Sequence, residues 1–254
     1  MRDQYAGDFS DLLKFAFLRV LAANDRTIGV AWYYTRANDR RRDGCHREYC
    51  HEPKWKSLDL AVWNALKELP ERSVDALERL RIWPAQTHFY HVPVPAKGSR
   101  PSWVQDIKCA LLGCGIVFLD RDNGVGNTSK RHATVDEIKE IRQPGRVVVL
   151  IKFPAGANHD RRVEQFHEML RDQTGAVSIV TVRTCVSLRQ PTFRWSTMVD
   201  ADDASVERAK QFAHTLDGIK ECSADVVCDS LGIKRRENQT MNGDRSLSID
   251  LPPQ

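Results

Sequence analysis

Three short apolar runs, each flanked by polar residues, constrain the fold of this chain more than any other feature. They span residues 28–34, 116–119 and 146–151. Each is short for a helix, and each is too continuously apolar for a strand with one face in water. Such runs are typical of strands buried on both faces of a parallel sheet. The sequence therefore predicts a sheet with cover on both sides.

Segments with helical periodicity separate these runs. Apolar residues recur at helical spacing after the capping residues 8–11, and helices are also expected at residues 103–112, 135–141, 160–172 and 204–216. Further strands are expected at residues 87–92, 177–182 and 193–199. This alternation predicts an α/β fold of Rossmann-like type, with a mostly parallel sheet and helices on both faces.

The length of 254 residues favours one elaborated domain. Helical patterns at residues 58–69 and 73–80, separated by Pro70, predict a small helical insertion at about 53–85. The Rossmann-like domain is expected to cover residues 1–217. Residues 218–254 are rich in Asp, Ser, Asn and Arg, and we expect them to form a polar, partly disordered extension.

Composition limits the classes of protein to which the chain can belong. No apolar stretch approaches the ~18 residues that span a bilayer, and seven cysteines are an odd number that favours reduced thiols, so we expect a cytoplasmic protein. The Cys–His pairs at 45–46 and 50–51 lack the spacing of a zinc site, and we assign no metal ligand. The formal charge of +4 leaves RNA or DNA open as partners. The oligomeric state is not indicated.

The candidate site residues directly follow buried strands, because ligands of open α/β sheets lie beyond the carboxyl ends of the strands. The run 116–119 ends in Asp120-Arg121-Asp122-Asn123-Gly124. Asn-Gly favours a tight turn, which would hold two carboxylates at the edge of the sheet. A solvated turn at the end of a strand is the alternative.

A second candidate region follows the first run. Tyr34 and Thr35 lead into a polar loop that contains Arg40, Arg41 and Arg42. Arginine offers forked donors to phosphate, so this loop either faces a phosphate-bearing ligand or is a solvated basic loop. Neither a glycine-rich dinucleotide fingerprint nor a P-loop is present in the sequence.

The N-terminal segment carries a family resemblance. Tyr5-Ala6-Gly7-Asp8-Phe9-Ser10-Asp11-Leu12-Leu13-Lys14-Phe15 resembles the H-A-G-N-x-A-D-V-x-K-H segment of the bacterial large-subunit rRNA adenine-N6 methyltransferases, which are S-adenosylmethionine-dependent. In that family the segment precedes a first Rossmann strand, a helical insertion and a strand that ends in D-P-P-Y. The order is the same here, with residues 120–123 at the place of D-P-P-Y. The chain also resembles uncharacterised bacterial proteins with D-P-D-N-G at this point.

The resemblance implies a nucleic-acid methyltransferase and a role for each candidate residue. Asp120 would accept a hydrogen bond from an adenine amino group, within a catalytic motif that includes Asp122 and Asn123. The cofactor would lie near Lys14, Asp11, Tyr34 and Thr35, and phosphates would be bound by Arg40, Arg41, Arg42, Lys130 and Arg131. Arg121 and Asp122 stand where the family has prolines, and Asn123 stands where it has the aromatic that stacks on the base.

Two other interpretations stay open. In a Mg²⁺-dependent nuclease or phosphodiesterase, Asp120 and Asp122 would share the metal ion and Lys152 would stabilise the charge on phosphate. In a catalytically inactive Rossmann module, the same edge of the sheet would bind a partner or nucleic acid without chemistry. The methyltransferase interpretation explains the order of the elements, and the nuclease interpretation explains why acids stand at the proline positions.

Overall fold

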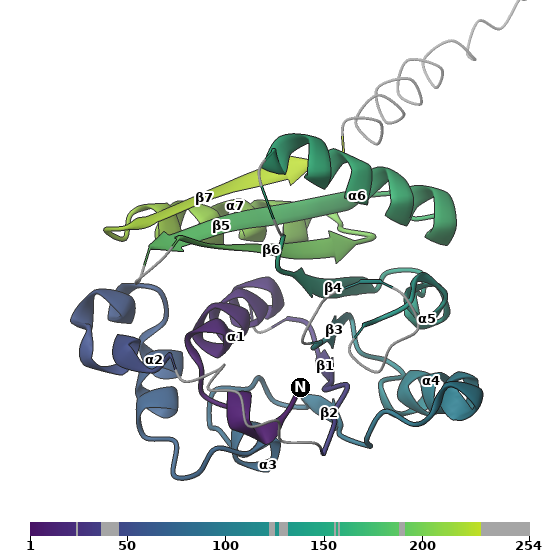
Figure 1. The fold of residues 1–254 in the computed structure, drawn as a ribbon, viewed down its shortest axis with the longest axis horizontal. Helices are drawn as coiled ribbons and strands as arrows, with labels where there is room; N and C mark the ends of the chain where they lie inside the picture. Colours follow the sequence, from purple (N-terminus) through teal and green to yellow (C-terminus); the bar gives the residue numbers. More distant parts are fainter. Residues whose placement is uncertain are drawn as a thin grey trace, which may run out of the picture.

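The protein is a mixed α/β structure in which one seven-stranded sheet lies between two layers of helices (Figure 1). The computed structural model describes residues 1–23, 25–36, 46–121, 125–126, 132–154, 156, 158–187 and 191–229. The strands are β1 (Ile28–Ala31), β2 (His88–Tyr90), β3 (Ile116–Leu119), β4 (Val147–Lys152), β5 (Ile179–Ser187), β6 (Pro191–Val199) and β7 (Cys222–Cys228). The helices are α1 (Phe9–Ala22), α2 (Leu60–Lys67), α3 (Val74–Glu78), α4 (Arg100–Ala110), α5 (Val135–Ile141), α6 (His159–Thr174) and α7 (Asp203–Asp217).

The sheet has the order β2-β1-β3-β4-β6-β5-β7. Strands β2, β1, β3 and β4 are parallel, whereas β6 pairs antiparallel with both β4 and β5, and β7 pairs antiparallel with β5. The predicted Rossmann-like fold is confirmed. The last expected strands form an antiparallel hairpin, because the residues between β5 and β6 are too few for the crossover that a parallel pair requires.

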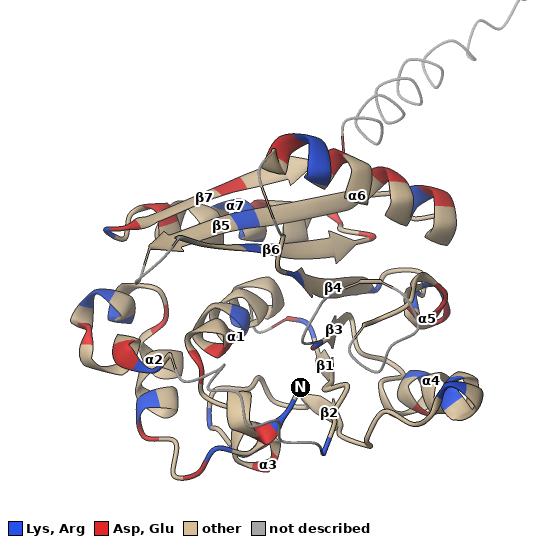
Figure 2. Ribbon diagram, viewed as in Figure 1, with Lys and Arg blue, Asp and Glu red and all other residues tan. Residues whose placement is uncertain are grey.

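Each face of the sheet has its own apolar core. In β3, Ile116 and Phe118 join the core beneath α1, α2, α3 and α7, whereas Val117 and Leu119 join the core beneath α4, α5 and α6. This alternation follows from the two-residue period of a strand. Strands β1 and β3 contain no charged residue, whereas β5 and β7 each carry a charged residue within the strand, Arg183 and Asp225 (Figure 2).

The sheet extends further along the chain than the sequence predicts. Strand β7, at Cys222–Cys228, lies within the expected polar extension and pairs with β5 along its length. Cys222, Ala224, Val226 and Cys228 pack against one core, whereas of their alternate neighbours Ser223 and Asp225 are polar and Val227 packs against the core on the other face. This alternation is typical of a strand at the edge of a sheet. The boundary predicted at residue 217 therefore moves beyond β7.

The helical insertion between β1 and β2 forms as expected, and it packs against α1. Its buried aromatic residues meet the start of that helix: the ring of Phe9 lies 4.6 Å from Trp55 and 5.6 Å from Tyr49. Helix α3 is shorter than the predicted 73–80. Within the described residues, no helix combines the length and the apolar character that crossing a membrane requires.

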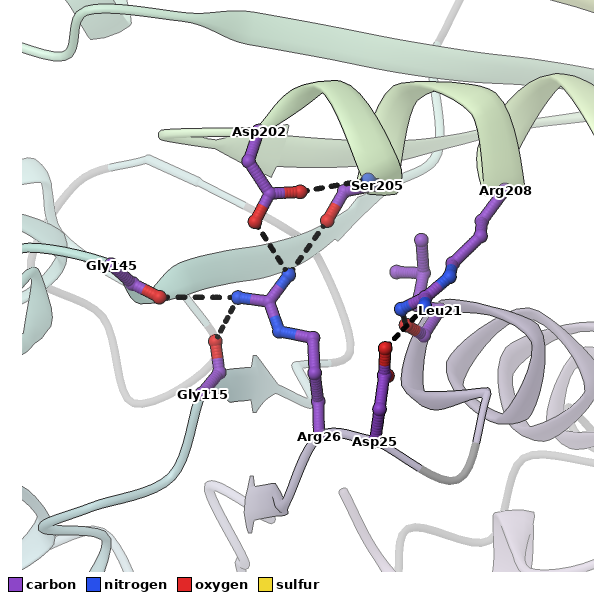
Figure 3. A network of polar contacts seen from close by, with 8 residues as sticks. All are labelled: Leu21, Asp25, Arg26, Gly115, Gly145, Asp202, Ser205 and Arg208. Atoms are coloured by element: carbon purple, nitrogen blue, oxygen red, sulfur yellow. Dashed lines mark hydrogen bonds and ion pairs between the residues drawn. The ribbon is translucent and has the colours of Figure 1, made fainter.

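Arg26 connects four segments at the amino edge of the sheet (Figure 3). One terminal nitrogen donates to Asp202 Oδ2 at 2.9 Å and to Ser205 Oγ at 2.8 Å, both at the start of α7. The other donates to the carbonyls of Gly115 at 2.8 Å and Gly145 at 3.1 Å, which precede β3 and β4. The guanidinium therefore holds the loops before β1, β3 and β4 to helix α7.

We expect Arg26→Lys to lower the free energy of unfolding by about 1–2 kcal/mol, because one ammonium cannot reproduce the forked contacts to these four acceptors. Chemical denaturation of the two proteins measures the difference. Arg79→Lys is the matched control, since Arg79 forms only an exposed pair with Glu71 and should change stability by less than about 0.5 kcal/mol. Equal losses of stability in the two variants would refute the role of the Arg26 guanidinium.

Candidate functional site at the carboxyl edge of the sheet

The carboxyl ends of β1 and β3 meet at the point where the strand order reverses. From β1 the chain continues to β2 on one side of it, and then crosses to β3 on the other side. Ala31 lies beside Leu119 in the register, and Asp120 N donates to Ala31 O at 2.9 Å. Ligands of open α/β sheets bind at such a reversal. The structure thus places Ala31, the last residue of β1, beside Asp120, whereas the expected run continues to residue 34.

Asp120 belongs to a buried group of charged side chains. Lys14 Nζ lies 2.9 Å from Asp120 Oδ1 and 3.0 Å from Asp11 Oδ1. Asp120 and Asp11 are each 1% exposed, and Lys14 is 7% exposed. Asp8 caps the start of α1, so Asp11 and Lys14 lie three residues apart on one helix face, which is turned toward the end of β3. The structure therefore brings together three of the predicted site residues.

The loop before α1 explains the glycine of the N-terminal segment. Gly7 has a φ of 75°, and a Cβ there would lie 2.8 Å from a methyl group of Leu69. Gly7 N donates to Asp11 Oδ2 at 2.9 Å, and Tyr49 Oη donates to Gly7 O at 2.9 Å. A side chain at this position would be strained and crowded. The hydrogen bond from Gly7 N thus fixes the orientation of the Asp11 carboxylate.

Arg194 of β6 completes the group, and the sequence analysis does not identify it. Its side chain is buried and donates to Ser10 O at 2.8 Å. Within the described residues, Arg194 Nε and Nη2 and Asp120 Oδ2 are buried and have no hydrogen-bond partner. The sequence feature that could have identified Arg194 is the presence of a basic residue within the expected strand 193–199. The group consequently contains an unsatisfied acceptor and unsatisfied donors.

Burial and charge set the protonation of this group. Burial raises the pKa of Asp11 to about 6, although Lys14 opposes the shift. Burial also disfavours the charged form of Lys14, but Asp11 and Asp120 outweigh it and raise the pKa of that ammonium. Burial lowers the pKa of Arg194 to about 10. The unsatisfied oxygen of Asp120 and the unsatisfied nitrogens of Arg194 can therefore receive a ligand that both donates and accepts hydrogen bonds.

The turn after β1 is filled by the side chains and the main chain of the protein itself. Trp32 and Tyr33 are 0% and 1% exposed, and Tyr33 has a φ of 42°. Met1 N donates to Tyr33 O at 3.1 Å, and Thr35 N donates to Met1 O at 3.0 Å. The guanidinium carbon of Arg121 lies 3.9 Å from the centre of the Tyr33 ring. A glycine turn lets a cofactor approach the backbone, and these residues prevent that approach.

The end of β2 also differs from a standard cofactor site. The strand ends at Tyr90 and is followed by His91, where an acidic residue would bind ribose hydroxyls. A pocket of about 570 Å³ opens there between Tyr34, Arg36 and His91. Tyr34 Oη donates to Asp3 Oδ2 at 2.6 Å, so this phenol is engaged within the protein. These residues and the filled turn do not fit S-adenosylmethionine.

One group of side chains has the spacing of metal ligands. In the described part of the chain, donor atoms of Asp75, Glu78 and His91 lie within 4.8 Å of one another, beside the same pocket. His91 Nδ1 lies 3.4 Å from Asp75 Oδ1 and 3.5 Å from Glu78 Oε1. Burial raises the pKa of Glu78. The same distances also fit a histidine that packs between two carboxylates without a metal ion.

Several predicted site residues lie outside the described residues. They are Asp122 and Asn123 of the proposed catalytic motif, together with Arg40, Arg41, Arg42, Lys130 and Arg131 of the proposed phosphate-binding set. Their roles stay predictions. Of the predicted set, the structure describes Asp120, Asp11, Lys14, Tyr34 and Thr35, and it joins the first three through ion pairs.

Comparison with known proteins supports the fold and leaves the function open. No family model matches the sequence, and no curated protein matches it. Among solved structures, the chain is similar to protein LPL1258 from Legionella pneumophila, described with the family model DUF519, at a TM-score of 0.51 and 14% identity. The similarity covers 89% of this chain and 98% of that chain. At this identity, the likeness extends to the fold alone.

Proposed function

We propose that the protein is a methyltransferase-like Rossmann module that binds nucleic acid and recognises a base with an exocyclic amino group at Asp120. The observation that carries this proposal is the buried Asp120 Oδ2, which has no hydrogen-bond partner among the described residues at the reversal of the strand order. Leaving a buried acceptor unsatisfied costs about 1–3 kcal/mol. An amino group bound at this oxygen would recover that cost.

Arg194 supports a base that offers an acceptor beside its amino group, as adenine and cytosine do, over uracil and thymine, which have no amino group. Adenine presents its amino donor beside the acceptor N7, and cytosine also carries an amino donor. The unsatisfied acceptor of Asp120 and the unsatisfied donors of Arg194 form the complementary set. Enzymes and RNA-binding proteins reach such edges when a base is unstacked or in a single strand. The family resemblance favours adenine between the two.

The proposal is for binding and not for methyl transfer. The buried Trp32 and Tyr33 and the paired main chain of the turn leave no glycine-like approach for S-adenosylmethionine, so we derive no step through that cofactor. The nuclease interpretation has less support at Asp120, because Lys14 already lies 2.9 Å from the oxygen that would bind Mg²⁺. Of the three interpretations, these contacts favour the Rossmann binding module.

The cysteines are consistent with a cytoplasmic location, which we propose for this protein. The six cysteines in the described residues are free: Cys50, Cys109, Cys114, Cys185, Cys222 and Cys228. Free thiols are typical of proteins from reducing compartments. RNA and DNA both fit the proposed partner class, since the recognised amino group is on the base and not on the sugar.

Binding to labelled oligo(A) and oligo(U) tests the proposal, because only adenine of the two bases carries an amino group. By fluorescence anisotropy, we expect oligo(A) to bind about tenfold more tightly, which is within the range of one two-point base contact. Asp120→Asn should abolish this preference and leave the affinity for oligo(U) unchanged, since an amide nitrogen replaces one acceptor oxygen.

Asp136→Asn is the matched control, because Asp136 is exposed in the first turn of α5 and distant in sequence from the group. It should retain the full preference for oligo(A). Melting curves establish that both variants are folded at the assay temperature. Equal binding of the two oligonucleotides by the wild-type protein, or a preference that survives in folded Asp120→Asn, would contradict the proposal.

A further inference from the structure

A second pocket lies at the same edge of the sheet, but on its opposite face. It has a volume of about 400 Å³ and opens between the end of β4, the start of β6 and helix α6. Leu150 belongs to the core beneath α6, so Lys152, two residues further along the strand, faces α6 as well. Lys14 and Asp120 lie on the side of α1. The two sites therefore do not share side chains.

The lining of this pocket is basic and aromatic. Lys152 and Arg162 contribute charge, whereas Phe166 and Trp195 contribute aromatic rings, and no acidic residue is found among the described residues that line it. Lys152 Nζ lies 4.1 Å from the centre of the Phe166 ring and 5.8 Å from that of Trp195. Lys152 forms no ion pair with any carboxylate in the described part of the chain.

Lys152 therefore has no carboxylate as a counter-charge among the described residues. Burial lowers the pKa of Lys152, and the nearby charge of Arg162 lowers it further. The lysine is held by aromatic faces, which stabilise a cation by much less than a buried anion would. An anion bound between Lys152 and Arg162 would relieve both the desolvation and the repulsion.

The first turn of helix α6 lies beside the pocket and contains the acidic Asp160, which pairs with Arg183, as well as Arg162. This helix of 16 residues begins at His159, and Arg162 lies in its first turn. The amino end of a helix attracts anions through its free N–H groups and its dipole. The ring of His159 stacks on Phe193 with centroids 4.2 Å apart, and Phe193 is 39% exposed. A stacked pair of rings, of which Phe193 is exposed and His159 is partly buried, therefore lies beside a basic pocket.

We propose that this pocket binds the phosphate of a nucleotide unit between Lys152 and Arg162, with the base against the His159–Phe193 pair. Arginine and lysine are the usual partners of phosphate oxygens, and aromatic rings stack on bases with little regard to sequence. The proposal does not require base recognition at Asp120, because the pocket lies on the other face of the sheet.

Calorimetric titration of the full chain with UMP and with uridine tests this site. The two probes differ only in the phosphate, and uracil has no amino group to engage Asp120. We expect UMP to bind at least tenfold more tightly than uridine. Lys152→Gln and Arg162→Gln should each reduce the affinity for UMP about tenfold, without changing that for uridine.

The controls match the change in charge. Lys139→Gln on α5 and Arg161→Gln on α6 each remove one exposed cation that does not line the pocket, and both should bind UMP as the wild-type protein does. Asp120→Asn should also bind UMP normally, so failure of this site and failure of the proposed function are separable. Equal affinities for UMP and uridine, or equal losses in the control variants, would overturn the proposal.

The phosphate in the pocket could come from a free nucleotide or from the phosphodiester backbone of a single strand. Binding of oligo(U) without a terminal phosphate distinguishes these two sources. If it binds, and Lys152→Gln reduces the slope of log affinity against log salt by about 0.7, the pocket takes the phosphodiester of a single strand. If only UMP binds, the pocket takes a free nucleotide. If neither probe binds, the phosphate site is refuted.

Discussion

Replacing Lys14 by methionine is expected to lower the free energy of unfolding by about 3–5 kcal/mol, which is typical when one partner of a buried ion pair is removed. The change leaves the carboxylates of Asp11 and Asp120 buried, close to each other and without the ammonium that lies 3.0 and 2.9 Å from them. Urea denaturation monitored by tryptophan fluorescence at pH 8 measures the loss.

Two comparisons separate electrostatics from packing in this result. Lys139→Met removes an exposed lysine and should change stability by less than about 0.5 kcal/mol. Adding Asp120→Asn to Lys14→Met should restore part of the loss, because one uncompensated charge disappears. The loss should also be smaller at pH 5 than at pH 8, since unpaired buried carboxylates bind protons more readily. A loss below about 1 kcal/mol at pH 8 would contradict the assignment.

His167 is expected to make the protein less stable in acid. His167 is a buried residue of α6, and its Nε2 lies 2.7 Å from Oγ1 of Thr181 on β5. Burial lowers the pKa of His167 from 6.5 to about 4, and Arg171 lowers it too, although Asp229 opposes the shift. The unfolded chain therefore binds a proton as the pH falls through 6.5, whereas the folded protein does not until about pH 4.

Between these two pH values the histidine should remove up to about 3 kcal/mol of stability, at about 1.4 kcal/mol for each unit by which the pKa is lowered. Above pH 6.5 it has no effect of this kind. The measurement is the free energy of unfolding of the wild-type protein and of His167→Gln from pH 8 to pH 4. The difference between the two proteins should change by up to about 3 kcal/mol in favour of the variant.

The wild-type protein has to be compared with His167→Gln because Asp11 changes the free energy of unfolding with pH in the opposite direction. Its pKa is raised to about 6, so its contribution to stability increases as the pH falls from 6 toward 3.8. Asp11 is present in both proteins and cancels in the difference. A difference that stays constant across the pH range would refute the role of His167.

The strands were predictable where they are apolar on both faces, and were less so elsewhere. Strands β1, β3 and β4 are nearly continuous apolar runs. A run of this kind is typical of a strand that is buried on both faces, so the sequence indicated these strands directly. Strand β7 contains Ser223 and Asp225 and lies in a segment rich in Asp and Ser, so its composition resembles that of a loop. The partner strand β5 supplies the backbone pairing that makes the segment a strand.

Part of the candidate site could also be predicted. The end of the run 116–119 places Asp120 at the carboxyl edge of the sheet, and the N-terminal segment places Asp11 and Lys14 on one face of a helix. Arg194 was missed because its strand is antiparallel, so that a residue near the start of β6 reaches the edge where the parallel strands end. The roles assigned to Tyr34 and Thr35 as cofactor ligands stay predictions.

The order of apolar runs and helices in the sequence was sufficient for the class of fold, because a strand that is apolar on both faces is stable only between two layers. Local sequence also determined where α1 begins, through the Asp8 cap and Gly7. Tertiary structure alone decided which charges meet: Lys14, Asp120 and Arg194 come from distant segments, and the Lys14–Asp120 ion pair and the burial of Arg194 beside these charges exist only after the sheet and α1 have packed. Electrostatic energy depends on distance and burial, and neither quantity is encoded in the local pattern of residues.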